Sequence, residues 1–170
     1  MASRLLVSSI IFLIIFKVVA IYFTNFSLYG DEAQYWLWSQ KPDLGYYSKP
    51  PLLAWFLSGY LGLFGDSFLS IKTFPIAIYL FISYAIYNLC LNLSFNKKNA
   101  QFCAVSFLVI PAASLSSFLV STDLLLLLFW TTGMVLLLKT IKNNSNLNFL
   151  LLGLIIGLGF LAKYAAIYFL

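Results

Sequence analysis

The sequence predicts an all-α membrane protein, built as a multi-pass helical bundle. Of its 170 residues, 62% are hydrophobic and only 9% are charged. The mean hydropathy of +0.96 indicates more apolar surface than a soluble domain buries. No alternation of apolar and polar residues favours a β-barrel. Helices are then the expected spanning elements, because backbone groups in lipid must satisfy their own hydrogen bonds.

Apolar stretches of spanning length predict four or five transmembrane helices. They cover residues 5–24, 70–91, 100–119, 123–139 and 147–169. The first stretch is too long for an ordinary signal-peptide core and lacks a convincing cleavage site, so it is expected to be retained. Residues 1–170 are expected to form a single transmembrane module. The apolar run that ends at Leu170 has no polar tail, which favours a module truncated from a longer protein.

The longest segment between two spans, residues 25–69, is the predicted first external loop. Residues 31–41 are expected to form a helix along the membrane surface. Residues 52–64 are apolar but too short to cross, and they follow Pro50-Pro51. A second helix, lying in the interface or dipping into the membrane, is expected there.

Charged residues predict the orientation. The basic residues that flank the spans on one side are Arg4, Lys97, Lys98, Lys139 and Lys142. The positive-inside rule identifies that side, and therefore the N-terminus, as cytoplasmic. The acids, all expected on the external side, are Asp31, Glu32, Asp43, Asp66 and Asp123. Because the basic residues are dispersed, the net charge of +5 indicates orientation in a bilayer and not binding of nucleic acid.

The residue types present limit the chemistry. Histidine is absent, which excludes His-based triads and His-ligated metal sites. Cys90 and Cys103 are not in a CxxC pair and are expected to be free thiols. No metal site and no cofactor are predicted, although paired acids have the oxygen ligands that a divalent cation prefers.

Asp31 and Glu32 are the strongest candidates for catalysis, since acids are costly next to a membrane span. On a helix over residues 31–41, turning about 100° per residue, Asp31, Tyr35 and Trp38 share one side, with Glu32 near its flank. Ala33, Trp36 and Leu37 would then face lipid or the bundle. A carboxylate beside aromatic rings suits a sugar, which offers hydroxyls and C–H faces. The alternative is that both acids only favour the positive end of the helix dipole.

Other charged residues have two interpretations each. Lys49 on the external face suits the phosphate of a lipid carrier, or merely lipid headgroups. Asp123 is either a second external acid or, with Thr122, the cap of the fourth span. Lys163 suits an anionic group or extends to the interface. Lys17, inside the first span, is a functional candidate by position, but extension of its ammonium to the interface is the favoured interpretation.

Three motifs resemble a known superfamily. They are Asp-Glu-Ala-x-Tyr-Trp from Asp31, Gly-Tyr-Tyr-Ser-Lys-Pro-Pro-Leu from Gly45, and Ser-Thr-Asp ahead of a leucine-rich span. With one span before them, they resemble the GT-C glycosyltransferases over residues 5–170. The bacterial protein mannosyltransferase-like group, related to the lipid A aminoarabinose transferase, is the most similar, and its N-terminal third corresponds to this chain.

The resemblance implies a function on the external face of a cell membrane, here the bacterial inner membrane. Such enzymes move a sugar from a polyprenyl-phosphate-linked donor to a glycan, lipid or protein acceptor. By position, Asp31 matches the acid proposed as base or as the group that orients the acceptor. Glu32 matches its partner, and Lys49 the basic residue that faces the donor phosphate. Many members have Asp-His-Pro-Pro where this chain has Ser-Lys-Pro-Pro. The remaining expected substrate-binding residues are Asp123, Tyr35, Trp38, Tyr47 and Lys163.

Two other classes of function stay open. A lipid-linked-sugar transporter or flippase is one, although transporters usually hold their polar site near the midplane and here the acids gather at one face. A non-catalytic membrane subunit, or an inactive fragment of an enzyme, is the other.

Overall fold

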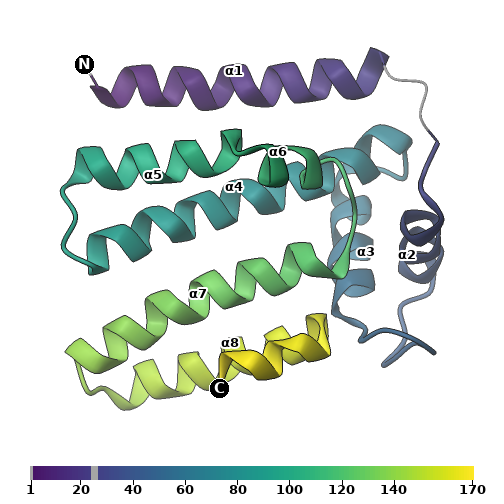
Figure 1. Ribbon diagram of the computed structural model, residues 1–170. Helices are drawn as coiled ribbons and strands as arrows, with labels where there is room; N and C mark the ends of the chain where they lie inside the picture. The colour runs from purple at the N-terminus through teal and green to yellow at the C-terminus, as the bar shows by residue number, and fades with distance from the viewer. Residues whose placement is uncertain (1, 24–26) are drawn as a thin grey trace.

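The computed structural model describes residues 2–23 and 27–170, with side chains from residue 8 onward. All regular structure in these residues is helical (Figure 1), which confirms the predicted all-α class. The elements are α1 (Ala2–Phe23), α2 (Gly30–Gln40), α3 (Leu52–Phe64), α4 (Phe68–Asn92), α5 (Lys97–Val109), α6 (Pro111–Ser116), α7 (Thr122–Lys142), α8 (Asn146–Ala162) and the 3-10 helix η1 (Tyr164–Phe169).

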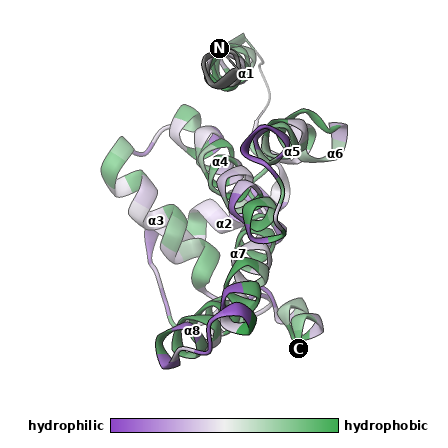
Figure 2. Cartoon of the chain, turned by 90° about the vertical axis from the view of Figure 1, so that its left-hand side faces the viewer, coloured by the Kyte–Doolittle hydropathy of each residue, from purple (hydrophilic) through white to green (hydrophobic). Residues whose placement is uncertain are grey.

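Five helices, α1, α4, α5, α7 and α8, run side by side with the chain reversing at their ends (Figure 1). Viewed along their axes, α1 stands apart from the other four (Figure 2). The short helices α2 and α3 lie together at one end of this layer, and α3 crosses the direction of the long helices (Figure 1). The connection between α6 and α7 also lies at this end, which we call the site end.

Among the residues whose side chains the structure describes, two helices are long and apolar enough to cross a membrane by length and composition. They are α4, with 25 residues, and α7, with 21. The predicted span over residues 100–119 is broken after Val109, where Ile110 is extended at φ −52° and ψ 129°. Pro111 explains the break, because proline has no N–H to continue the helix and disfavours a helical residue before it.

The predicted spans at the two ends of the chain also differ from the observed helices. Residues 147–169 are divided at Lys163, an extended residue that ends α8 and precedes η1. The first helix begins earlier than predicted, at Ala2, and ends at Phe23. Residue 24, which the prediction included, lies outside the described residues.

Helix α3 has the bounds predicted for it, and one of its faces is buried against the rest of the protein. Its Leu53 and Leu57 are 1% and 0% exposed, and they belong to the core cluster with Phe74, Leu124 and Leu125. The helix ends at Gly65, whose φ of +84° is strained for a residue with a side chain. Packing of α3 against α2, α4 and α7 therefore fixes the elements of the site end.

The five acids and one group of lysines lie at opposite ends of the long axis, as predicted. Lys97, Lys98, Lys139 and Lys142 lie at the end opposite the site end, while the segments that carry the five acids lie at the site end (Figure 1). The side chain of Arg4 is outside the described residues. This separation fits the predicted orientation, and the side of the membrane that each end faces stays a prediction.

Candidate active site

The first turn of α2 holds the two candidate acids in different environments. Asp31 is exposed and Glu32 is 1% exposed. The Glu32 carboxylate reaches back along the chain, where its Oε2 accepts the backbone N–H of Tyr29 at 3.0 Å. This contact satisfies a donor that the helix itself leaves unpaired, so the interpretation as stabilisation of the helix start applies to Glu32.

Glu32 also ties α2 to two distant segments. Its Oε2 forms an ion pair with the Lys72 ammonium on α4 at 2.6 Å. Its Oε1 accepts the backbone N–H of Val120, just before α7, at 2.9 Å. The Lys72 ammonium donates further to the Phe118 carbonyl oxygen at 3.4 Å. Both oxygens of Glu32 are thus occupied by protein donors.

These contacts give Glu32 a structural role, while its predicted catalytic role stays a prediction. A buried carboxylate that already accepts three protein hydrogen bonds has little capacity left for a substrate hydroxyl. The sequence analysis missed its partner, Lys72. The signal was available, since Lys72 is a lysine inside a predicted span, and ionisable residues there need a partner.

Tyr35 belongs to the buried face of α2. Its side chain is 3% exposed, and burial raises the pKa of its phenol above the ordinary value. The nearby Asp31 and Asp123 carboxylates raise this pKa further, while a hydrogen bond with the Thr122 side chain opposes them. Asp31 and Asp123, far apart in the sequence, therefore both act on the pKa of this phenol.

The environment of Tyr35 predicts a shifted titration. Because burial and the two carboxylates disfavour tyrosinate, its phenol should lose its proton above pH 10.0, the ordinary pKa. The folded state then holds this proton more tightly than the unfolded state, so stability falls as the pH rises past that value. The difference in tyrosinate absorbance between the wild type and Tyr35→Phe measures this pKa. A transition at or below the ordinary value would contradict the described burial.

Asp123 and Lys163 form an ion pair at the site end. The Lys163 ammonium lies 2.6 Å from Asp123 Oδ1, with side chains 34% and 67% exposed. Asp123 is in the first turn of α7 and Ser121 takes the N-cap position, so the predicted capping role of Thr122 or Asp123 is not observed. Such an exposed pair contributes little to stability, about 0–1 kcal/mol. Both groups remain accessible to a ligand.

Burial of Tyr35 and Glu32 on α2 departs from the predicted sugar-binding side, while the exposed Leu37 is compatible with the predicted lipid-facing side. Glu32, Tyr35 and Ser39 form its buried face, while Leu37 is 63% exposed. Glu32 points into the protein because its hydrogen-bond donors, the Lys72 ammonium and the Val120 N–H, lie on that side of the helix. In this arrangement Tyr35 offers no exposed ring face on which a sugar can stack.

The other two aromatic candidates are Trp38, near the end of α2, and Tyr47, in the loop that follows this helix. The Trp38 ring is half-buried and stacks on Tyr46 with centroids 4.4 Å apart, so one of its faces is covered. Tyr47 is fully exposed. The loop is held in place by the Trp55 Nε1–H, which donates to the Asp43 carbonyl oxygen at 2.7 Å. Of these residues, Tyr47 is the most open to a ligand.

Lys49 is half-buried immediately before the buried Pro50 and Pro51, at the start of α3. Within residues 8–23 and 27–170, no carboxylate forms an ion pair with it. Its ammonium is thus available to bind another anion. Its predicted role towards a phosphate stays a prediction.

No group of three or more potential metal-ligating side chains occurs among the described residues. Both cysteines are free thiols, as predicted.

An open groove of about 790 Å³ lies beside the Glu32–Lys72 pair. Its lining is mostly apolar, with Lys72 and Tyr29 at the site end. The other lining residues are Phe16, Ala20, Ile21, Ser27, Leu28, Leu115, Phe118 and Leu119. A groove of this composition matches a lipid chain better than a free sugar.

Comparison with known proteins identifies the family. The family model described as dolichyl-phosphate-mannose-protein mannosyltransferase matches residues 48–170. A lipid A galacturonosyltransferase, RgtD, from Rhizobium johnstonii is 32% identical over 163 residues, which cover 91% of this chain. The chain spans only 33% of that relative's length. No solved structure matches.

The matched region begins just before Lys49 and continues through Asp123 and Lys163 to the last residue. The alignment with RgtD covers nearly the whole chain. These matches agree with the motif resemblance, and the chain belongs to the dolichyl-phosphate-mannose-protein mannosyltransferase family, within the GT-C superfamily of glycosyltransferases.

Proposed function

We propose that this protein transfers a sugar from a polyprenyl-phosphate-linked donor to an acceptor hydroxyl on the external face of the bacterial inner membrane. In this proposal the chain is a multi-pass module with its N-terminus in the cytoplasm. The long helices, including the broken ones, provide four or five crossings. The site end faces outward. The similarity to a lipid A galacturonosyltransferase favours a glycolipid acceptor over a protein.

Asp31 is the proposed general base. Its exposed carboxylate takes the proton from the acceptor hydroxyl while that oxygen attacks the anomeric carbon. The new glycosidic C–O bond forms as the bond from the anomeric carbon to the phosphate oxygen breaks. Attack from the side opposite the phosphate inverts the anomeric configuration, by the same logic as a single-displacement glycosidase.

Lys49 and Lys163 are the proposed partners of the departing phosphate. Negative charge grows on the phosphate oxygens as the sugar leaves, and fixed ammonium groups stabilise it. In the structure Lys163 forms an ion pair with Asp123. A phosphate that approaches Lys163 would compete with Asp123, which leaves the Asp123 carboxylate to accept from the sugar or acceptor.

The observation that carries this proposal is the exposed Asp123–Lys163 ion pair, which lies at the same end of the molecule as the exposed Asp31. Two exposed acids from separate helices, an ammonium paired with one of them and an apolar groove nearby suit a substrate that combines sugar, phosphate and lipid.

A transfer assay with the full-length protein tests the proposal. Inverted and right-side-out vesicles would receive a labelled polyprenyl-phosphate sugar and extracted membrane glycolipid. We expect label in the glycolipid fraction only when donor and acceptor reach the external face. Label that crosses the bilayer but stays on polyprenyl phosphate would instead support a flippase. Label that neither crosses nor moves to acceptor would support a non-catalytic subunit.

A further inference from the structure

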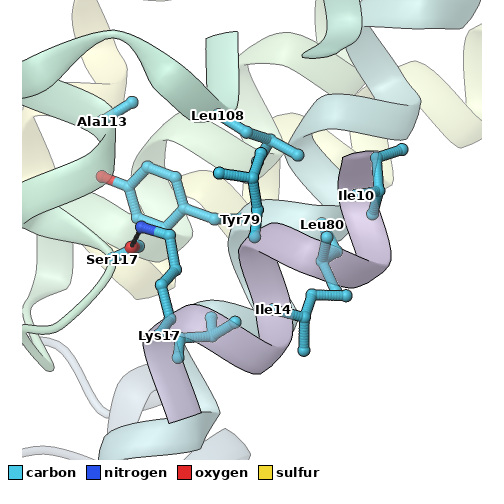
Figure 3. A pocket seen from close by; sticks show the side chains of 10 residues that line it. Ile10, Ile14, Lys17, Tyr79, Leu80, Leu108, Ala113 and Ser117 are labelled. Carbon is cyan, nitrogen blue, oxygen red and sulfur yellow. Dashed lines mark hydrogen bonds between the residues drawn. The ribbon is translucent and has the colours of Figure 1, made fainter. Parts of the chain in front are cut away.

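Lys17 is a buried lysine that the proposed reaction does not use. It lies in the second half of α1 and is 5% exposed. Its ammonium donates to the Ser114 carbonyl oxygen at 2.9 Å, to Ser114 Oγ at 3.0 Å and to Ser117 Oγ at 2.7 Å. Figure 3 shows the side chain directed at Ser117 beside a cavity of about 10 Å³. The expected extension of Lys17 to the interface is therefore wrong.

The Lys17 ammonium has one oxygen partner for each of its hydrogen-bond donors. A lysine ammonium has three donors and no acceptor, and three oxygens receive them. The Phe118 ring lies 4.8 Å from the same nitrogen, which adds a cation–π contact. A lysine in the hydrocarbon costs roughly 2.5–3.5 kcal/mol on insertion scales, so such an arrangement needs compensation from its partners.

The partners of Lys17 are Ser114 in α6 and Ser117, the first residue of the connection between α6 and α7, residues 117–121. Further along this connection, the Phe118 carbonyl oxygen accepts from Lys72 at 3.4 Å and the Val120 N–H donates to Glu32 at 2.9 Å. The next residues are Thr122, which bonds Tyr35, and Asp123, which pairs with Lys163. Three charged side chains thus hold a short segment that ends at the candidate acid.

Lys17 holds this connection at one end and the Glu32–Lys72 pair holds it near the other. Without the Lys17 contacts, the Ser114 carbonyl oxygen, close to the end of α6, would keep only its bond from the Ser117 hydroxyl. The connection could then move relative to α1, and Asp123, two residues beyond its end, would move with it.

We propose that Lys17 is a positioning residue for Asp123: through Ser114 and Ser117 it holds the α6–α7 connection, and so the start of α7, in place relative to Asp31. The importance of this placement for sugar transfer depends on the proposed function. The mechanical coupling between Lys17 and the connection does not depend on it, and it can be measured without any substrate.

The test uses a cysteine reporter in the full-length protein in detergent, with Cys90 and Cys103 replaced by alanine. Ser121→Cys reports on the connection, and Thr140→Cys, buried near the other end of α7, reports on the rest of that helix. We expect Lys17→Met to raise the maleimide reaction rate at position 121 by about tenfold, because local opening increases when bonds to a charged group are lost. The rate at position 140 should change by less than about twofold.

Two controls separate this coupling from general damage. Lys98→Met removes an exposed ammonium at the opposite end and should leave both rates unchanged. Ser117→Ala should raise the rate at position 121 on its own and add little to Lys17→Met, since both changes break one contact. In the transfer assay, Lys17→Met should lower kcat and leave the KM for the donor nearly unchanged.

An unchanged rate at position 121 in Lys17→Met would overturn the inference. Equal increases at positions 121 and 140 would overturn it as well, because they would show that Lys17 stabilises the whole fold and not the connection. If the protein transfers no sugar at all, the proposed function fails while the labelling result still decides the role of Lys17.

Discussion

Replacement of Asp31 by Asn in the full-length protein is expected to reduce sugar transfer by about 10²–10⁴-fold, the usual contribution of a positioned acid or base. Asn keeps the shape of the side chain but cannot take a proton from the acceptor hydroxyl. The fold should tolerate the change, because the Asp31 side chain is exposed at the start of α2. Initial rates of label transfer, with KM measured for donor and acceptor separately, test this expectation.

A matched control exists at the same end of the molecule. Asp66→Asn makes the same change in charge, and the remaining amide oxygen can still accept the Trp36 Nε1–H that Asp66 accepts at 2.8 Å. This variant should transfer sugar at close to the wild-type rate. Undiminished transfer by Asp31→Asn would remove Asp31 from the mechanism. An equal loss in both variants would indicate that the negative charge of the site end matters, and not the position of one carboxylate.

The sequence predicted the parts of this structure that depend on local pattern. The bounds of α3 follow from an apolar run between Pro50-Pro51 and Gly65, and those of α2 from one short amphipathic segment. Separation of the acids from Lys97, Lys98, Lys139 and Lys142 follows from the alternation of spans. Such features need no knowledge of how distant helices pack.

The sequence failed where a side chain finds its partner through tertiary packing. Burial of Glu32 depends on Lys72, forty positions further along, and on an N–H of the segment before α7. Lys17 is satisfied by serines of α6 and the connection after it only because Pro111 breaks the helix there. A helical wheel of α2 alone therefore could not predict that Glu32 and Tyr35 are buried.

The second large effect is expected at the Glu32–Lys72 pair. Glu32→Gln keeps the hydrogen-bonding shape but leaves the Lys72 ammonium buried without a counter-charge. Lys72→Met leaves the Glu32 carboxylate buried without a counter-charge. Loss of one partner of a buried pair typically costs about 3–5 kcal/mol, which is a large part of the stability of a small bundle. Denaturant titration in mixed micelles measures the free energy of unfolding of each variant.

The double variant distinguishes a specific pair from two unrelated buried residues. When Glu32→Gln and Lys72→Met are combined, no unpaired charge remains, and the loss of stability should be clearly smaller than the sum of the single losses. The Val120 N–H can still donate to the amide oxygen of the introduced Gln, so the connection keeps one of its ties to α2. Losses that simply add would show that each residue stabilises the fold without the other. In that case the Glu32–Lys72 pair would not determine where Asp31, the neighbour of Glu32, lies relative to the start of α7.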